Sequence, residues 1–133
     1  MTVVDASALI ESLLRTPLGT KCTERLLRTG DQLFAPHLLD IEVAQVLRRY
    51  ALRGDLENER GHQALLDLAG FPLIRYAHEP FLERIWELRH SLSAYDAAYI
   101  ALAEALDAPL VTCDSRLARA PGHGARVEVL AEL

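Results

Sequence analysis

The chain has 133 residues, half of them hydrophobic and a quarter charged, with a net charge of −5. This length and balance predict one globular domain over residues 1–133 with a hydrophobic core of its own. No apolar run is long enough to span a membrane, and residues 1–5 lack the basic and apolar regions of a secretion signal. We therefore expect a cytoplasmic protein with no membrane contact, one that does not bind nucleic acid through bulk positive charge.

In chain order, short β-prone runs alternate with segments whose apolar residues recur at helical spacing. The strands are predicted at 2–4, 33–35, 72–74, 110–112 and 126–129. The helices are predicted from residue 6 onward and at 17–28, 38–53, 57–69, 80–92, 93–108 and 115–118. This alternation predicts an α/β fold, a three-layer sandwich around a short, mainly parallel sheet with the first strand at its centre.

Asp5 stands where the first strand passes into the first helix. The position suits a helix N-cap, but it also suits a binding site, because ligands of parallel α/β sheets bind beyond the carboxyl ends of the strands. Ser7 follows two residues later, and its hydroxyl either supports whatever Asp5 binds or faces solvent.

Basic and cysteine residues of the second helix receive no firm chemical role. Lys21, Arg25 and Arg28 form a basic stripe, which we interpret as a solvated face, with contact to an RNA backbone as the alternative. Cys22 and Cys113 are too few and too far apart in the chain to predict a disulfide framework. We interpret both as thiols, with Cys113 as a small core residue. The five histidines show no metal-ligand spacing.

Glu42 is the acid that local structure explains least well. Leu38 and Leu39 lie one turn before it and Val46 one turn after it, so Glu42 projects from the apolar stripe of its helix. A carboxylate there is costly unless a charged group meets it. Asp40, in contrast, is explained by the helix dipole. Glu42 is therefore the first acid that favours a functional role.

Two further acids lie near the ends of a helix and a strand. Ser93 is a natural N-cap, and Asp96, three residues later, either completes a capping box or serves a site from the first helical turn. Asp114 lies just past the strand at 110–112, where it either caps the short helix at 115–118 or joins Asp5 beyond the sheet.

These four acids are compatible with one pocket, although they are far apart in the chain. Two carboxylates ~4 Å apart repel by about 4 kcal/mol at an effective dielectric of ~20, so only cations or protonation make such a cluster tolerable. Donor sets made of oxygen alone select hard ions, so we expect Mg²⁺ or Mn²⁺. Such ions activate water and stabilise charge at phosphorus, which predicts phosphodiester hydrolysis. They would also admit a nucleic acid to an acidic cleft.

The segments around these acids, taken together, resemble the acidic motifs of PIN-domain ribonucleases, and in particular those of VapC toxins from bacterial and archaeal toxin–antitoxin pairs. The segments are VVDASAL at 3–9, LDIEV at 39–43, LSAYDAAY at 92–99 and LVTCD at 110–114. Each is a weak motif alone, but their joint order and spacing are specific. The resemblance covers the whole chain and implies a PIN-like fold.

The resemblance also implies an Mg²⁺-dependent endoribonuclease, with Mn²⁺ able to substitute. The implied catalytic residues are Asp5, Glu42, Asp96 and Asp114. Asp5, Asp96 and Asp114 are the implied metal ligands, Asp114 from the rim of the pocket, and Ser7 supports them with its hydroxyl. A homodimer and a cognate VapB-type antitoxin, whose tail covers the cleft, are implied as well. RNA cleavage would then arrest growth once the antitoxin is degraded.

Three other classes were weighed against this interpretation. A phosphoacceptor receiver domain needs an acidic pair after its first strand and a lysine near its last one, but Ala6 follows Asp5 and Lys21 is the only lysine. A haloacid-dehalogenase-like phosphatase needs Asp-x-Asp, whereas this chain has Asp5-Ala6-Ser7. A catalytically silent PIN-like binding module is the third alternative, and the presence of all four acids counts against it.

Overall fold

The centre of the fold is a sheet of five short strands, and the computed structural model describes it within residues 1–131. The domain expected over 1–133 extends two residues beyond this range. The strands are β1 (Thr2–Val4), β2 (Leu33–Pro36), β3 (Leu73–Tyr76), β4 (Leu110–Thr112) and β5 (Val127–Val129). Their order is β3-β2-β1-β4-β5, and every neighbouring pair is parallel. The predicted parallel sheet and the central position of β1 are confirmed.

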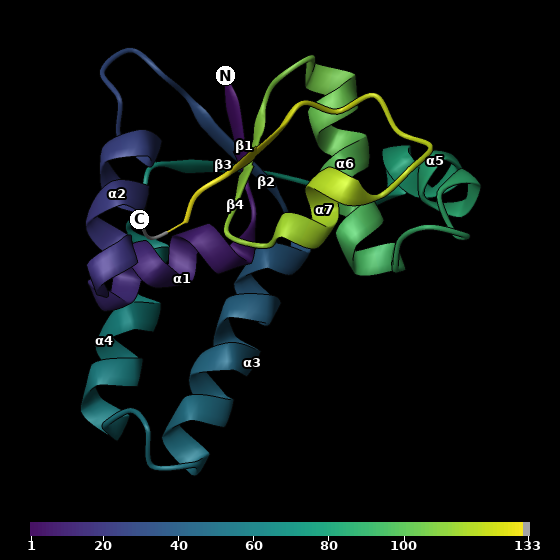
Figure 1. The fold of residues 1–133 in the computed structure, drawn as a ribbon. Coiled ribbons are helices and arrows are strands. Elements are labelled where there is room, and N and C mark those ends of the chain that lie inside the picture. The colour runs from purple at the N-terminus through teal and green to yellow at the C-terminus, as the bar shows by residue number, and fades with distance from the viewer. Residues whose placement is uncertain (132–133) are drawn as a thin grey trace.

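Helices cover both faces of this sheet (Figure 1). They are α1 (Ala6–Leu14), α2 (Pro17–Leu26), α3 (Leu38–Leu52), α4 (Asn58–Ala69), α5 (Leu82–Glu87), α6 (Ala94–Leu106) and α7 (Ser115–Arg119), with a 3₁₀ turn, η1, at Glu79–Phe81. The chain runs from β1 to β3 in one direction and then returns past β1 to β4. Right-handed crossovers therefore place α1 to α4 on one face and α5 and α6 on the other, as the predicted three-layer sandwich requires. No helix within residues 1–131 combines the length and apolar character needed to cross a membrane.

The central strand β1 and its neighbour β4 are buried on both faces, which explains why apolar residues follow one another directly in each. Val3 and Val4 of β1 and Leu110 and Val111 of β4 have no exposed surface, as expected where helices cover both faces of a parallel sheet. Val3 pairs with Leu110 and Val4 with Val111. This register brings the residues that follow β1 and β4 together where the strand order reverses, the usual place for a site in such sheets.

The helix predicted over 80–92 is wrong in its second half. The α-helix α5 ends at Glu87, and the chain then turns, with the Ser91 and Leu92 N–H groups both donating to the Leu88 carbonyl oxygen at 3.1 and 3.0 Å. The apolar spacing nevertheless marked the inward side correctly, because Leu88 is buried and Leu92 packs against the core. The apolar spacing therefore predicted correctly which side chains are buried, but it did not predict where the helix ends.

The basic stripe of the second helix is only partly a solvated face. Arg25 is 8% exposed, and its guanidinium lies 2.5 Å from Glu128 Oε2 in β5 and 3.5 Å from Asp31 Oδ2 before β2. Arg25 therefore links α2 to β5 and to the segment before β2, and its guanidinium is not available to a partner. Arg28 is exposed but lies beyond the end of α2 at Leu26, so the helix predicted over 17–28 is two residues too long.

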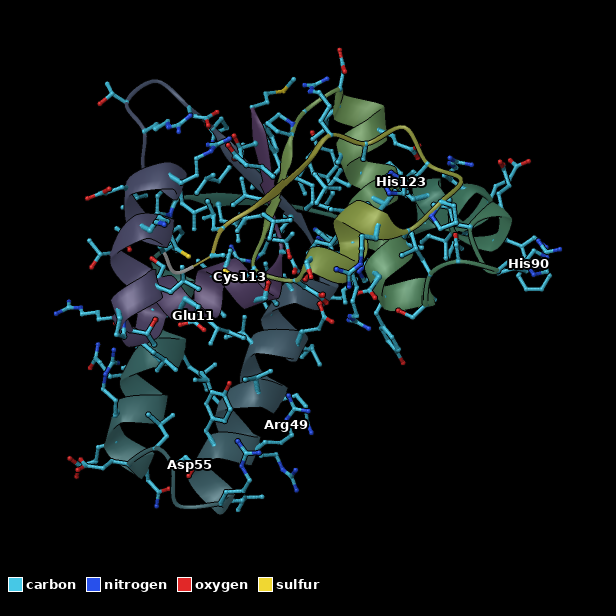
Figure 2. All side chains as sticks on the ribbon, viewed as in Figure 1. Glu11, Arg49, Asp55, His90, Cys113 and His123 are labelled. Carbon is cyan, nitrogen blue, oxygen red and sulfur yellow. The ribbon has the colours of Figure 1, made fainter. Side chains whose placement is uncertain are left out.

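Two of the five histidines lie beside each other, with the ring centroids of His37 and His78 6.0 Å apart. Figure 2 shows His90 beyond α5 and His123 in the loop after α7, both well away from Cys113. Two of the histidines accept backbone hydrogen bonds: His78 Nε2 from the Leu38 N–H at 2.9 Å, and His123 Nδ1 from the Ala125 N–H at 3.1 Å. Their observed contacts stabilise loops, which agrees with assigning them no chemistry.

Candidate active site

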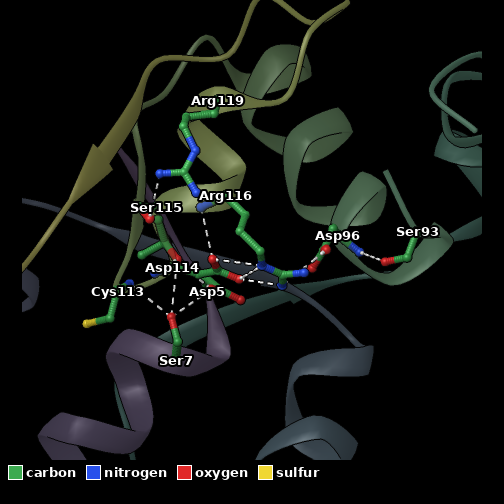
Figure 3. A network of polar contacts seen from close by, with 10 residues as sticks. Asp5, Ser7, Ser93, Asp96, Cys113, Asp114, Ser115, Arg116 and Arg119 are labelled. Atoms are coloured by element: carbon green, nitrogen blue, oxygen red, sulfur yellow. Dashed lines mark hydrogen bonds and ion pairs between the residues drawn. The ribbon is translucent and has the colours of Figure 1, made fainter. Parts of the chain in front are cut away.

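Asp5 lies at the junction of β1 and α1, with a carboxylate that is 8% exposed. It occupies the N-cap position of α1 but its side chain makes no capping hydrogen bond. Instead, Asp5 Oδ2 accepts hydrogen bonds from the Ser7 hydroxyl at 2.8 Å and the Thr112 hydroxyl at 2.6 Å. The capping alternative is therefore wrong for Asp5, whose side chain faces the end of β4 (Figure 3).

The two hydroxyl groups connect Asp5 to the backbone after β4. Ser7 Oγ accepts the Cys113 N–H at 2.9 Å, and Thr112 Oγ1 accepts the Asp114 N–H at 2.9 Å. Because each hydroxyl has a single proton, both protons are directed at Asp5, which acts as the acceptor. Burial raises the pKa of Asp5, the two hydroxyl donors oppose that rise, and the charge of Asp96 adds to it.

Glu42, in the first half of α3, is half-buried and is held by Tyr99 of α6. The Tyr99 hydroxyl donates to Glu42 Oε1 at 2.5 Å, and Tyr99 has no exposed surface. Burial raises the pKa of Glu42, and the charges of Asp5 and Asp96 raise it further. The apolar stripe correctly marked Glu42 as buried, but the group that meets it is a neutral hydroxyl and not the expected charge.

Asp96 lies in the first turn of α6, and the predicted N-cap is present, since the Asp96 N–H donates to Ser93 Oγ at 3.1 Å. The Asp96 carboxylate, 26% exposed, lines a pocket of about 490 Å³ with Glu42, Tyr95 and Arg116. No hydrogen bond from the Ser93 N–H to this carboxylate occurs among residues 1–131, so the capping box is not closed. The carboxylate is left facing the pocket.

Asp114 does cap α7, because its Oδ1 accepts the Arg116 N–H at 3.0 Å. The guanidinium of Arg116 also forms an ion pair with this carboxylate, with Nη2 at 2.5 Å from Asp114 Oδ2. The same Nη2 lies 3.9 Å from Asp96 Oδ2, so the guanidinium lies between the two acids (Figure 3). These hydrogen bonds lower the pKa of Asp114. The capping alternative is therefore correct for Asp114, which also borders the acidic site.

All four predicted acids are brought to one edge of the sheet. The charge of Asp96 raises the pKa of Asp5, the charges of Asp5 and Asp96 raise that of Glu42, and Arg116 links Asp114 to Asp96. Within the part of the chain that the structure describes, no three His, Cys, Asp or Glu side chains already surround a common point tightly enough to hold an ion. The donor set, carboxylate and hydroxyl oxygens without His or Cys, has the chemistry of a site for a hard cation.

Sequence analysis missed three residues that complete this site. Thr112 was assigned only to a strand, although a fully buried threonine beside the end of β1 needs a polar partner. Tyr99 was given no role beyond its place in the predicted helix, although it lies one helical turn after Asp96 on the same face. Arg116 follows Asp114 by two residues, and nothing in its spacing indicated that it bridges two acids.

Fold and site together define a small parallel α/β domain with an acidic site at its strand-order switch. The family model described as PIN domain matches residues 2–123. Curated relatives include Ribonuclease VapC12 of Mycobacterium tuberculosis, 38% identical over 131 residues, covering 98% of this chain and 100% of the relative. VapC ribonuclease Mb0985 of Mycobacterium bovis is 46% identical over 117 residues and covers 88% of each chain. The chain therefore belongs to the PIN-domain family, among its VapC proteins, as the sequence resemblance implied.

Solved structures show the same fold at low sequence identity. VapBC2 from Rickettsia felis, bound to a DNA fragment from its promoter, aligns with a TM-score of 0.71 at 15% identity and covers 98% of both chains. VapC20 of Mycobacterium tuberculosis, described as a sarcin–ricin loop cleaving toxin, aligns with a TM-score of 0.69 at 14% identity, over 95% of this chain and 99% of that one. Both confirm the α/β sandwich.

Proposed function

We propose that this chain is a metal-dependent endoribonuclease that hydrolyses phosphodiester bonds in RNA and acts as the toxin of a type II toxin–antitoxin pair. One observation carries the proposal: Asp5, Glu42, Asp96 and Asp114 come from four separate segments and meet at one edge of the sheet. The ribonuclease names of relatives that cover nearly the whole chain support it.

Asp5, Asp96 and Asp114 would hold the metal ion, and Mg²⁺ is the ion that we propose, with Mn²⁺ able to replace it. Once bound, the ion would supply a nucleophile from water and offset the charge that develops on the phosphate oxygens. Asp114 would have to leave Arg116 to take part directly, since the two are in contact in this structure. The oxygen-only donor set supports a hard cation.

The chain's own residues perform the remaining tasks. Ser7 and Thr112 orient Asp5 through its Oδ2 atom, and such support from neighbouring hydroxyls keeps a ligating carboxylate in place. Tyr99 occupies Glu42 Oε1 and leaves Oε2 as the atom that can take a proton from the attacking water. Burial raises the pKa of Glu42, which makes its carboxylate a stronger base than an exposed glutamate. The pocket of about 490 Å³ beside Glu42 and Asp96 would receive the scissile phosphate and its neighbours.

The proposed toxin role requires a partner that silences the site. We propose a VapB-type antitoxin and a homodimer of this chain, in line with the VapC names of its relatives and the toxin–antitoxin complexes among structures of the same fold. Large apolar side chains that are available for such contacts include Ile41 and Tyr95, 73% and 67% exposed, which line a hollow next to the acidic pocket. Growth would stop when the antitoxin is degraded and the site becomes free to cut RNA.

The test is incubation of the purified protein with structured RNA in Mg²⁺, in Mn²⁺ or in EDTA. We expect cleavage with either ion, none with EDTA, and loss of cleavage in Asp5→Asn and Asp96→Asn. Asp55→Asn is the matched control, because Asp55 is an exposed acid in the loop between α3 and α4, far from the site (Figure 2). Equal cleavage by the site variants and the wild type would refute the proposal. A folded wild type without any RNA cleavage would favour the silent binding module instead.

A further inference from the structure

We propose that Cys22 and Cys113 are a modification site, at which a hydroperoxide converts two thiols into an intramolecular disulfide that weakens the acidic site. Both cysteines are free, and their sulfur atoms lie 3.7 Å apart although the residues are 91 positions apart in the chain. Sequence spacing alone argued against such a pair, whereas the packing of α2 against the end of β4 creates it.

The geometry requires little movement for the bond to form. A disulfide has an S–S length of about 2.05 Å. Starting from 3.7 Å, each sulfur has to move by half of the difference, about 0.8 Å. Rotation of each Cα–Cβ torsion by roughly 30° covers that distance, and this is a moderate departure from a staggered rotamer. Neither helix nor strand has to be broken, so the folded protein can form the bond.

Exposure sets the order of the two chemical steps. Cys22 is fully buried, whereas Cys113 is partly exposed, so the peroxide reaches Cys113 first. Its sulfur attacks the O–O bond and becomes a sulfenic acid, with one oxygen leaving as water. The Cys22 sulfur then attacks the Cys113 sulfur, the S–O bond breaks, and a second water leaves. The peroxide takes two electrons from the two sulfurs, and the two thiol protons end in water. Because burial raises the pKa of both thiols, the reaction is slow.

The position of Cys113 connects this bond to the acidic site, and here the inference rests on the proposed function. Cys113 lies between Thr112 and Asp114, and its N–H donates to Ser7 Oγ at 2.9 Å. Because the rotated Cys113 side chain is strained, relaxation of that strain pulls its backbone toward α2. This shifts the segment that supplies the Thr112 hydroxyl and the Ser7 contact, and both of these groups hold Asp5. Oxidation should therefore weaken divalent-ion binding and slow RNA cleavage.

The chemical part of the proposal is tested by treating the full-length protein with hydrogen peroxide and measuring its mass without reduction. We expect a monomer lighter by about 2 Da with no free thiols, as the loss of two hydrogens requires. Trypsin digestion should give one linked species that joins residues 22–25 to residues 90–116. Cys22→Ala and Cys113→Ala should give no such species. Persistent free thiols, or dimers linked between chains, would overturn the disulfide.

The functional part is tested on the same samples by calorimetric Mn²⁺ titration and by RNA cleavage. We expect at least fivefold weaker Mn²⁺ binding after oxidation, a matching loss of cleavage, and recovery of both with dithiothreitol. Oxidised Cys22→Ala, which cannot form the bond, should bind Mn²⁺ as before. A similar loss in Cys22→Ala, or unchanged binding in the crosslinked wild type, would refute control of the site. If the reduced wild type cuts no RNA, the proposed function fails, whereas the mass and Mn²⁺ measurements still decide the disulfide.

Discussion

The Tyr99 hydroxyl donates to Glu42 Oε1 across 2.5 Å, which joins α6 to α3 at the acidic site. Tyr99→Phe removes this donor and leaves a half-buried carboxylate without it. We expect unfolding free energy to fall by about 2 kcal/mol, the usual size for a hydrogen bond to a charged group. The RNA cleavage rate should fall about tenfold, because a misplaced base costs about 1.4 kcal/mol in the barrier.

Urea unfolding and single-turnover cleavage measure the two effects of Tyr99→Phe. Tyr50→Phe is the matched control, since the Tyr50 hydroxyl makes no hydrogen bond to any group within residues 1–131. If both variants behaved alike, the Tyr99 hydroxyl would have no role beyond packing.

Asp5→Asn should stabilise the metal-free protein in a pH-dependent way. Burial raises the pKa of Asp5 above its ordinary value of 3.8, so the folded state holds the proton more tightly than the unfolded state. Stability of the wild type therefore falls as pH rises from about 4 through the raised pKa, and asparagine does not titrate. At pH 7 we expect the free energy of unfolding of Asp5→Asn to exceed that of the wild type by about 1 kcal/mol, as is common when a residue kept for function is replaced. Urea unfolding in EDTA at pH 4 to 8 checks this, and a gain that does not vary with pH would contradict it.

Thr112→Val should damage the site while it preserves the shape of the core. Thr112 has no exposed surface, donates to Asp5 Oδ2 and accepts the Asp114 N–H, so valine deprives both neighbours of a partner. We expect a loss of about 2 kcal/mol in stability, as for a buried group left unsatisfied, together with weaker Mn²⁺ binding. Thr112→Ser keeps the hydroxyl and should restore binding. Failure of serine to restore it would assign the effect to packing.

Arg116→Gln should strengthen divalent-ion binding. The Arg116 guanidinium contacts Asp114 and lies near Asp96, so it occupies two of the proposed metal ligands with a positive charge. Without it, we expect Mn²⁺ to bind severalfold more tightly in a calorimetric titration. Arg119→Gln is the control for a change in net charge, because Arg119 lies one turn further along α7 and its side chain bonds to Ser115 and to no other group within residues 1–131. Unchanged or weaker binding by Arg116→Gln would show that Arg116 does not compete with the ion.

Arg25→Ala should destabilise the fold, whereas Arg28→Ala should not. Arg25 is buried, and Glu128 loses its ion-pair partner in the variant, whereas Asp31 keeps the N-terminal amino group at 2.9 Å. We expect a loss of about 2 kcal/mol, below the usual cost of breaking a buried ion pair because Glu128 is partly exposed. Thermal unfolding measures this, and the exposed Arg28 should change it by less than about 0.5 kcal/mol. If the two substitutions changed the stability equally, Arg25 would belong to a solvated basic face, as the sequence predicted.

Local sequence patterns were enough to predict most helices and strands and to identify the acids as candidate site residues. Asp5 and Asp114 were found because each follows a β-prone run, and Glu42 because it interrupts an apolar stripe. Parallel strands bring their carboxyl ends to one edge, so these local placements implied a common site without any knowledge of register. The central position of β1 was also predicted correctly, whereas the order of the other strands was not predicted.

The contacts between remote segments could not be predicted in the same way. Periodicity indicates which face of a helix is buried, but it does not identify the neighbour, so the partner of Glu42 remained open until Tyr99 was seen beside it. The burial of Arg25 and the approach of Cys22 to Cys113 depend equally on how α2 packs. The interpretation of Cys113 as a core residue is correct only in part, because Cys113 packs against the core but is partly exposed, whereas Cys22 is fully buried.

The pairing of β1 with β4 has a consequence for how the protein is made. Asp5 leaves the ribosome 107 residues before Thr112, whose hydroxyl supports it. A nascent chain that has not yet released β4 lacks the register that gathers the acids. The acidic site is therefore completed late in the synthesis of this domain, after β1 and the helices that follow it have emerged.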